Sequence, residues 1–419
     1  MKADIITIGD EILIGQVLDT NSVYLASELT KLGFTVRKIL SIADNAIAII
    51  NTLDESIKES DLIIVTGGLG PTNDDKTKDT LTGYFKGIYI VHEKSLEQIR
   101  KFFAARGMIL SERNRKQAEI PDTCEPLLNI YGTAPGMLFR KENKMIISLP
   151  GVPFEMKGLF EDQAKPIILS HFKLPVLRYR TILTTGLSES TTADLLHDWE
   201  RGLEEEFNLA YLPSPGLLRL RLSISGDNED YLVEKLNIKV SELAAILGED
   251  NVFGFDDDTL SSIVGALLQK NTLTLSVSES CTGGYISHLI TSVPGASVYF
   301  KGSIVAYSNE IKQNILDVEP QTIREYGAVN EKVVSQMAEN SRIKLHTDFG
   351  LATSGIAGPD GGSARKPVGT TWISVATPER VITQKFLFGD NRERNIIRAS
   401  LSGLNMLRIA LRDYIKNSK

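Results

Sequence analysis

The sequence is poor in the residues from which zinc sites and disulfides are built. Its 419 residues include two cysteines, Cys124 and Cys281, and five histidines. The two cysteines form no CxxC pair and provide no disulfide framework, so a reducing compartment, the cytoplasm, is expected. Because so few histidine and cysteine ligands are present, a metal ion would be held by carboxylates, the ligands of hard cations such as Mg²⁺.

Two further absences exclude classes of function. No apolar run approaches the roughly 20 residues that a membrane-spanning helix needs, and Asp4 and Asp10 interrupt the start of the chain in a way that is not typical of a signal peptide. The net charge of −7 argues against a general nucleic-acid-binding surface. The composition, 42% hydrophobic and 24% charged, is that of an ordinary globular protein.

The length and the order of the predicted elements indicate three domains. Residues 1–166 alternate strands with helices, which is typical of parallel βαβ units and a doubly wound sheet. Residues 167–250 predict a small α+β domain, in which Leu218–Ser225 alternates like a half-exposed antiparallel strand. Residues 259–419 again predict an α/β domain, and Asp256–Asp258 are expected to cap its first helix.

The segment Ser278–Gly284, with the sequence SESCTGG, is the most informative stretch of the chain. It follows the apolar run Leu273–Val277 and precedes a helical pattern, so a strand is expected to carry Ser280 into a glycine turn that opens a helix. Such turns place nucleophiles and anion-binding groups beside a positive helix N-terminus. Ser280 is therefore the predicted nucleophile of an acyl hydrolase, with Cys281 as its rival.

A serine hydroxyl needs a base that removes its proton. His288 qualifies by residue type, but it lies within a helix whose apolar side indicates a structural or surface role. Lys312 is the better candidate because Ser–Lys pairs are a known variant of the catalytic triad, provided that burial or a neighbouring cation lowers its pKa. Tyr307 is a candidate for relaying the proton or orienting the lysine.

Other polar groups follow the ends of neighbouring predicted strands, where ligands bind in open α/β sheets. Arg392 suits bidentate phosphate binding, and Arg394 and Arg398 are the alternatives. The full set of predicted substrate-binding residues is Thr282, Gly283, Gly284, Asn309, Ser354, Gly355, Gly358 and Arg392.

Two acidic loops follow predicted strands of the first domain, Gly9–Glu11 and Gly67–Asp75. Their glycines and Thr72 are predicted to cradle a phosphate. Three acids, Asp10, Asp74 and Asp75, are predicted to hold a divalent cation that bridges phosphate oxygens; helix capping by Asp74 and Asp75 is the alternative interpretation. A third loop, Leu149–Met156, is expected to close the same pocket. The predicted nucleotide or phosphate site comprises Asp10, Glu11, Asn21, Gly67, Gly68, Gly70, Thr72, Gly151 and Glu155.

Seven strings, in this order along the chain, resemble the CinA family of competence- and damage-inducible proteins. The resemblance covers essentially the whole chain, with Ser278 where the family commonly has alanine and Asn391 inserted before Arg392. The strings are GDEILIGQVLDTN at 9–21, GGLGPTNDDKT at 67–77, NRKQAEIP at 114–121, LPGVPFEM at 149–156, SESCTGG at 278–284, YSNEIK at 307–312 and SGIAGPDGG at 354–362.

This resemblance implies a fold and an activity for each domain. The first domain is similar to the MoaB/MogA molybdopterin-binding fold, associated in this family with ADP-ribose pyrophosphatase activity that depends on a divalent metal (Mg, Mn or Co). The second resembles a KH-type domain. The third resembles nicotinamide-nucleotide amidohydrolase, which converts nicotinamide mononucleotide to the acid and ammonia without a cofactor. The Ser–Tyr–Lys set of that enzyme falls on Ser280, Tyr307 and Lys312, and its later substrate positions fall on Ser354 and Arg392.

We therefore expect a bifunctional pyridine-nucleotide hydrolase that is cytoplasmic and homodimeric. Its partners are expected to be small-molecule nucleotides, nicotinamide mononucleotide and ADP-ribose, with no direct nucleic-acid contact and no membrane. One alternative is a molybdopterin-binding protein, which rests on the shared N-terminal fold alone. The other is a non-enzymatic protein associated with competence or DNA damage, which the family name suggests and the acidic balance disfavours.

Overall fold

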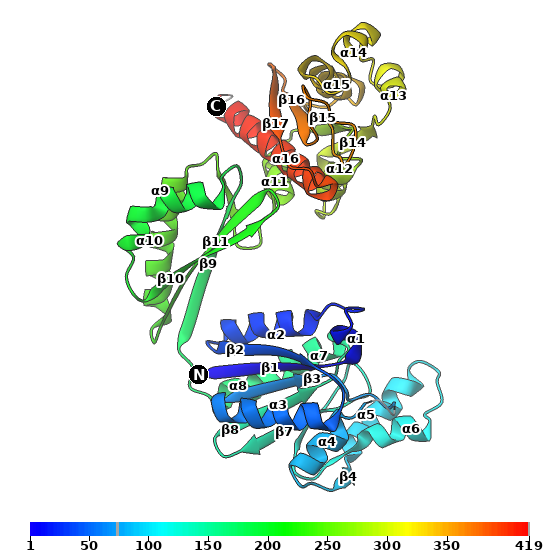
Figure 1. Ribbon diagram of the computed structural model, residues 1–419, viewed down its shortest axis with the longest axis vertical. Coiled ribbons are helices and arrows are strands. Elements are labelled where there is room, and N and C mark those ends of the chain that lie inside the picture. Colours follow the sequence, from blue (N-terminus) through cyan, green and yellow to red (C-terminus); the bar gives the residue numbers. More distant parts are fainter. Residues whose placement is uncertain (73–74, 418–419) are drawn as a thin grey trace. The chain divides into compact units, whose positions relative to one another are not determined.

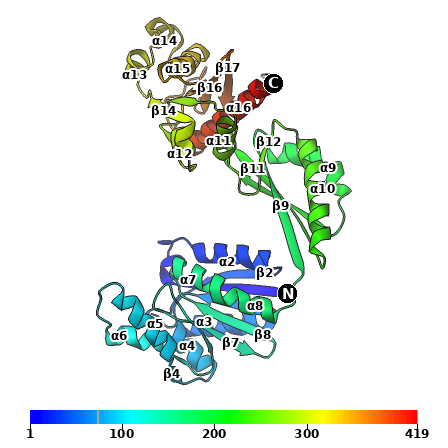
Figure 2. The ribbon, with the colours of Figure 1, turned by 180° about the vertical axis from the view of Figure 1, so that it is seen from behind.

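The computed structural model describes residues 1–72 and 75–417. The chain divides into two compact units, one of Met1–Arg178 with Ser225–Glu229 and the other of Tyr179–Ile224 with Asp230–Lys419. Figures 1 and 2 show the elements of each unit. Within the described ranges, none of the helices is both long enough and apolar enough to span a membrane.

The first unit is built on a six-stranded sheet in the order β2-β1-β3-β8-β7-β6. Strands β2, β1, β3 and β8 are parallel, and β7 is antiparallel to both of its neighbours. A two-stranded antiparallel ribbon of β4 and β5 lies apart from this sheet. The strands are β1 (Lys2–Ile8), β2 (Thr35–Ile42), β3 (Leu62–Thr66), β4 (Tyr89–Val91), β5 (Glu119–Pro121), β6 (Glu125–Leu127), β7 (Gly136–Lys141) and β8 (Lys144–Leu149). The helices are α1 (Asp10–Leu13), α2 (Thr20–Lys31), α3 (Ala46–Glu59), α4 (Thr77–Tyr84), α5 (Glu93–Ala104), α6 (Glu112–Arg115), α7 (Pro153–Leu159) and α8 (Lys165–His171).

Apolar residues cover both faces of this sheet. In β1, Ala3 and Ile5 pack into a core with α2, α7 and α8, while Ile6 and Ile8 pack into a second core with α3 and α4. Alternate side chains of a strand point to opposite faces, so a strand that is apolar throughout must be buried on both sides. The predicted doubly wound domain is therefore confirmed, with an antiparallel edge that the alternation of strands and helices did not reveal.

The middle domain is a four-stranded sheet, in the order β10-β11-β9-β12, with two helices. Its elements are β9 (Val176–Thr184), α9 (Glu189–Arg201), β10 (Phe207–Ser214), β11 (Leu217–Gly226), α10 (Glu229–Leu247) and β12 (Val252–Phe255). Along β11 the leucines at 218, 220 and 222 are buried while Arg219 and Arg221 are exposed, as predicted. The short strand β12 was not predicted; it pairs antiparallel with β9.

The prediction that Asp256–Asp258 cap the next helix, α11 (Leu260–Lys270), was wrong. The Oγ1 of Thr259 accepts a hydrogen bond from the Ser262 backbone at 3.0 Å, and the Ser262 hydroxyl accepts one from the Thr259 backbone at 2.9 Å. This reciprocal pair satisfies the first free N–H groups of the helix. The Asp256 carboxylate instead accepts the Thr181 N–H of β9 at 2.9 Å, so it belongs to the middle sheet.

The C-terminal domain has a five-stranded sheet in the order β14-β13-β15-β16-β17. Strands β14, β13 and β15 are parallel, while β16 and β17 run antiparallel to their neighbours. One face packs on α11, α12 and α16, and the other packs on α14 and α15. The elements are β13 (Leu275–Glu279), α12 (Tyr285–Thr291), β14 (Phe300–Val305), α13 (Asn309–Asn314), α14 (Pro320–Tyr326), α15 (Glu331–Lys344), β15 (Phe349–Gly355), β16 (Thr370–Ala376), β17 (Val381–Leu387) and α16 (Arg392–Asn417).

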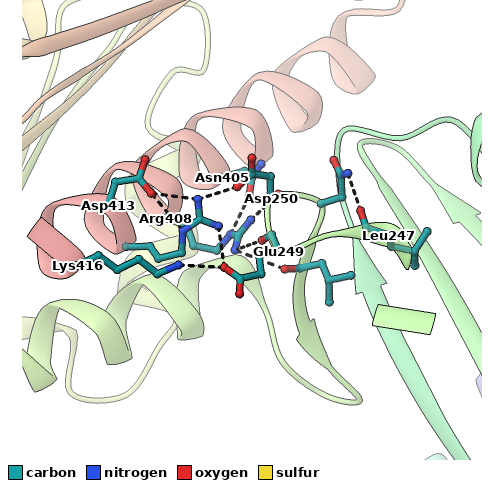
Figure 3. Close-up of polar contacts among 10 residues, drawn as sticks. Leu247, Glu249, Asp250, Asn405, Arg408, Asp413 and Lys416 are labelled. Atoms are coloured by element: carbon teal, nitrogen blue, oxygen red, sulfur yellow. Dashed lines mark hydrogen bonds and ion pairs between the residues drawn. The ribbon is translucent and has the colours of Figure 1, made fainter. Parts of the chain in front are cut away.

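A buried arginine joins the middle domain to the last helix (Figure 3). Arg408 of α16 donates to the backbone carbonyls of Glu249 at 3.1 Å and Asp250 at 2.6 Å, directly after α10. Glu249 and Asp250 lie in the turn between α10 and β12, and Arg408 supplies hydrogen-bond donors to their carbonyls. An ion pair between Lys416 and Glu249 at 3.1 Å adds to this contact.

Candidate active site

The C-terminal domain brings the predicted serine and lysine into contact. Ser280 follows β13 and Lys312 lies in α13, the helix that follows β14. Because β13 and β14 are parallel neighbours, their carboxyl ends meet at the same edge of the sheet. The Nζ of Lys312 lies 3.1 Å from the Oγ of Ser280, at hydrogen-bond distance.

Lys312 is buried without an acidic partner. Its side chain is 1% exposed, and its amine donates to the backbone carbonyls of Ala306 at 2.7 Å and Tyr307 at 3.4 Å. Burial disfavours the charged ammonium and lowers the pKa of Lys312 to about 8. A lysine with this pKa is partly neutral near pH 7 and is able to accept a proton.

Cys281 lies beside Ser280 but has the wrong protonation state for a nucleophile. Burial raises the pKa of its thiol to about 12, so the reactive thiolate is scarce at neutral pH. His288, the other candidate base, is exposed on α12 and does not line the pocket around Ser280.

A pocket of about 300 Å³ opens over Ser280. Eight of the predicted residues line it: Ser280, Tyr307, Asn309, Lys312, Ser354, Gly355, Gly358 and Arg392. The rival nucleophile Cys281 also lines it, together with six residues that had no predicted role: Ala328, Val329, Ile356, Ala357, Asp360 and Gly361. They come from the ends of β13, β14 and β15 and from the start of α16.

Arg392 and Tyr307 meet at the mouth of this pocket. The Arg392 guanidinium donates to the Tyr307 hydroxyl at 3.1 Å and to the Gly358 carbonyl at 2.8 Å. Tyr307 is 62% exposed, and its backbone carbonyl rather than its phenol contacts Lys312. The structure therefore places the tyrosine side chain with the arginine. Arg394 lies in the first turn of α16, where its N–H donates to the Asn391 side chain at 2.9 Å, and Arg398 lies against Gly216 of the middle domain.

Ser354, the polar end of β15, points away from the nucleophile. Its side chain is buried and donates to the carbonyl of Ala328 at 2.8 Å, a residue of the loop that precedes α15. The hydroxyl thus holds two walls of the pocket together. The glycine loop that follows contributes Gly355 and Gly358 to the lining.

The three predicted residues of the glycine turn lie outside the pocket lining. Thr282 is buried, and its hydroxyl bonds to that of Thr353 at 2.8 Å. The N–H of Gly283 donates to the Ser280 carbonyl at 3.2 Å, and the N–H of Gly284 donates to the Glu279 carboxylate at 3.0 Å. Glu279, which the sequence analysis did not single out, also accepts the N–H groups of Ile286 and Ser287 at the start of α12. The N-terminus of this helix is therefore already occupied.

In the first unit, the predicted glycine loops meet at the ends of β1, β3 and β8. Asn21 joins two of them by donating to the Gly151 carbonyl at 2.7 Å and to the Thr66 hydroxyl at 3.2 Å. Gly67 has φ +111°, and a side chain there would lie 2.1 Å from the carbonyl of Ile8, so only glycine allows this close approach.

The predicted acids of the first unit are held by local contacts. Asp75 accepts hydrogen bonds from the backbone and hydroxyl of Thr72, while Asp10 accepts the Asp44 N–H at 3.4 Å. Glu155 accepts from Asn129 at 2.7 Å, and burial raises the pKa of its carboxyl group. The Glu11 carboxylate folds back over Gly9.

The described acids do not assemble a metal site. Asp74 lies outside the described residues, and among the residues on either side of that gap no three His, Cys, Asp or Glu side chains are grouped to hold a metal ion. Of the other two predicted ligands, Asp10 is bonded to the backbone of Asp44 in the loop after β2, and Asp75 is bonded to Thr72 within its own loop, so the two carboxylates are not directed at one shared ion.

A second pocket, the Lys78 pocket, lies in the first unit beside Gly70, Thr72 and Asp75. It has a volume of about 410 Å³, and its wall carries both cations and carboxylates: the lining residues are Gly70, Pro71, Thr72, Asp75, Lys78, Asp79, Tyr89, Glu112, Arg113, Lys116, Gln117 and Glu119. The Lys78 amine donates to the carbonyls of Lys116 at 3.2 Å and Glu119 at 3.0 Å, and burial lowers its pKa. Gln117 is 4% exposed, and its buried Oε1 has no hydrogen-bond partner among the described residues. Sequence reasoning missed these side chains because they lie on α4, α6 and the turn after α6, away from the glycine motif.

Comparison with known proteins agrees with this architecture. Three family models match successive parts of the chain: a probable molybdopterin binding domain at 4–170, the damage-inducible protein CinA KH domain at 179–254 and the CinA C-terminal domain at 257–411.

Full-length relatives are also found. A CinA-like protein of Cytophaga hutchinsonii is 47% identical over 98% of both chains, and one of Flavobacterium psychrophilum is 44% identical over 99% of this chain and 100% of its own. Among solved structures, the protein CinA of Thermoplasma acidophilum is 36% identical and covers 40% of this chain and 98% of its own, with a TM-score of 0.37. The chain therefore belongs to the CinA family, with a molybdopterin-binding-like first domain, a KH-type middle domain and the C-terminal domain of the family.

Proposed function

We propose that the C-terminal domain hydrolyses the carboxamide of nicotinamide mononucleotide to the carboxylate and ammonia. The contact between Lys312 Nζ and Ser280 Oγ at 3.1 Å carries this proposal. A neutral amine has two N–H donors and one lone pair. The carbonyls of Ala306 and Tyr307 accept the two donors, so the lone pair is left for the Ser280 hydroxyl.

The residues of the pocket supply each step of an acyl transfer. Lys312 removes the proton of Ser280, and the Oγ attacks the carboxamide carbon. The lysine then returns the proton to the departing ammonia, and an attacking water, deprotonated by the same lysine, hydrolyses the acyl-enzyme. The N–H groups of Gly283 and Gly284 are already bonded, so we assign stabilisation of the oxyanion to the backbone N–H of Cys281, a residue of the pocket lining.

Arg392 is the proposed phosphate ligand. Its guanidinium lies at the mouth of the pocket, and two of its N–H donors are used by Gly358 and Tyr307. The planar guanidinium has five donors, so three stay available for phosphate oxygens. The family to which the chain belongs supports the choice of a pyridine mononucleotide as substrate.

Replacement of the nucleophile tests this proposal. We expect Ser280→Ala to abolish ammonia release from nicotinamide mononucleotide in metal-free buffer, while the circular dichroism spectrum and the melting temperature match those of the wild type. Thr291→Ala, an exposed position on α12, is the matched control and keeps its activity. Ammonia release by Ser280→Ala at the wild-type rate would reject the nucleophile.

We propose, as a second function, that the first domain cleaves the pyrophosphate of ADP-ribose. The Lys78 pocket supports this, because Arg113 and Lys116 are exposed cations on its wall and the buried oxygen of Gln117, which has no partner among the described residues, is able to accept a hydrogen bond from a ligand. We derive no step through the divalent cation, since the described carboxylates do not form its site.

Two variants of the Lys78 pocket test this second function. Arg113→Ala and Lys116→Ala are expected to raise the KM for ADP-ribose, measured with Mg²⁺, Mn²⁺ or Co²⁺ and with EDTA. Ammonia release by the C-terminal domain serves as the internal control, and it should be unchanged in both variants. Unchanged kinetics with ADP-ribose in both variants would assign the reaction to another site.

A further inference from the structure

The turn that carries the nucleophile is closed by a buried carboxylate. Glu279, the last residue of β13, is 0% exposed. Its carboxylate accepts four hydrogen bonds: from the Gly284 N–H at 3.0 Å, the Ile286 N–H at 3.1 Å, the Ser287 N–H at 2.9 Å and the Ser287 hydroxyl at 2.6 Å. The Gly284 donor ends the turn and the other three lie in the first residues of α12, whereas Glu279 lies before the turn.

This arrangement fixes Ser280 from both sides. The backbone N–H of Ser280 donates to the Thr353 carbonyl at 3.0 Å, which ties the turn to β15. On the other side the Glu279 carboxylate spans residues 280–283 and holds the first turn of α12. Gly283 and Gly284, with φ of +60° and +98°, allow the tight path between these two anchors.

The hydrogen bonds of Glu279 also fix the position of its negative charge relative to Lys312. A helix N-terminus stabilises an anion through its free N–H groups and its dipole, and here Glu279 is that anion. An acidic group this close to the base would raise the pKa of a lysine if it formed an ion pair. The bonds to α12 direct the carboxylate elsewhere, and among the residues that the structure describes the hydrogen-bond partners of the Lys312 amine are Ser280 and two backbone carbonyls.

We propose that Glu279 is a positioning residue of the amidase site, which holds Ser280 in its attacking geometry by locking the turn to α12. This inference rests on the proposed C-terminal function. It also assigns the substrate phosphate to the Arg392 side of the pocket, because the N-terminus of α12 has no donor left at Gly284, Ile286 or Ser287.

The test compares Glu279→Ala, Glu279→Gln and Ser287→Ala in the full chain. Glu279→Ala frees the turn, and a nucleophile displaced by about 1 Å loses roughly 100-fold in kcat. Glu279→Gln keeps the shape but turns an amide NH₂ group toward at least one N–H donor, so its kcat lies between those of Glu279→Ala and the wild type. Ser287→Ala removes one donor of four and stays close to the wild type.

Three readouts separate positioning from a general loss of structure. Throughout the series kcat falls while the KM for nicotinamide mononucleotide changes little, because Arg392 is untouched. The pH at which kcat reaches half its maximum stays at the wild-type value in Glu279→Gln. If Glu279→Ala does not fold, the kcat values of Glu279→Gln and Ser287→Ala still test the positioning role, which requires the kcat of Glu279→Gln to be the lower of the two.

Acylation of Ser280 by p-nitrophenyl acetate, located by mass spectrometry, provides a measurement that needs no nucleotide. One outcome overturns the positioning role and leaves the proposed function intact. In that outcome the wild-type protein is acylated at Ser280 and releases ammonia, while the Glu279→Gln variant has the kcat of the wild type. A shift of more than one pH unit in the profile of Glu279→Gln also overturns it and makes Glu279 an electrostatic partner of Lys312. A wild-type protein that neither acylates nor releases ammonia overturns the proposed function, and the role of Glu279 with it.

Discussion

The protonation of Lys312 sets a measurable pH dependence for the proposed amidase. Its pKa is lowered by burial from 10.5 to about 8. At pH 7 about one lysine in ten is then neutral, compared with about one in three thousand for a lysine of ordinary pKa, a gain of roughly 300-fold in active base. Because only the neutral amine accepts the Ser280 proton, kcat should rise with pH and level off above about pH 8.

Two substitutions test whether Lys312 acts as a general base or only as a positive charge. Lys312→Met removes the amine and is expected to lower kcat by about 100-fold to 10,000-fold, the usual contribution of a general base. Lys312→Arg keeps a positive charge but is not deprotonated in a protein, so we expect it to be as inactive as Lys312→Met. Ammonia release is measured between pH 6 and 10 in the presence of EDTA.

The same measurements define how this prediction fails. A kcat that is flat across the whole pH range would show that no group of pKa near 8 controls the reaction. Substantial activity in Lys312→Arg would show that the site needs a cation rather than a base. Either result would contradict the role that the 3.1 Å contact with Ser280 supports.

Three further predictions follow from the same pocket. Cys281→Ala should keep most of the ammonia release, because burial raises the pKa of this thiol to about 12 and leaves it protonated; loss of acylation in this variant would make the cysteine the nucleophile. Arg392→Lys should raise the KM for nicotinamide mononucleotide more than it lowers kcat, since lysine lacks the planar fork; an unchanged KM would place the phosphate elsewhere. Lys312→Met should stabilise the fold at pH 7 by up to about 3 kcal/mol, since the pKa of the buried lysine lies about 2.5 below its ordinary value. Between pH 8 and 10.5 the unfolded chain binds more protons than the folded one, so the free energy of unfolding of the wild type should rise through that window. The extra stability of Lys312→Met should therefore disappear above pH 10.5. Urea unfolding at pH 7 and at pH 10.5 measures this difference, and an equal difference at both pH values would contradict the prediction.

The contact between Ser280 and Lys312 was predictable from the sequence because the order of the strands determines where both residues lie. Ser280 and Lys312 each follow a predicted strand, and neighbouring parallel strands bring their carboxyl ends together. The apolar run before the glycine turn and the helical pattern after it predict the position of Ser280 between a strand and a helix. The length of α13 and the polar start of that helix likewise placed Lys312 within its first turns.

The direction of individual side chains was not readable. Thr282 belongs to the same motif as Ser280, yet its hydroxyl turns away to Thr353. Tyr307 contacts Lys312 through its backbone, and its phenol lies with Arg392. These differences depend on the direction of each Cβ after a strand ends, and sequence patterns carry no such information outside regular elements.

The sequence by itself determined the succession of α/β, α+β and α/β domains, the family and the pairing of Ser280 with Lys312, because periodicity and motif order are properties of the chain alone. Only the tertiary structure decided that Lys312 is buried without an acid, that Glu279 occupies the N-terminus of α12 and that Lys78, Arg113 and Gln117 share a pocket. Burial and hydrogen-bond partners arise from segments that are distant in sequence, and those quantities set the protonation of the base and the position of the nucleophile.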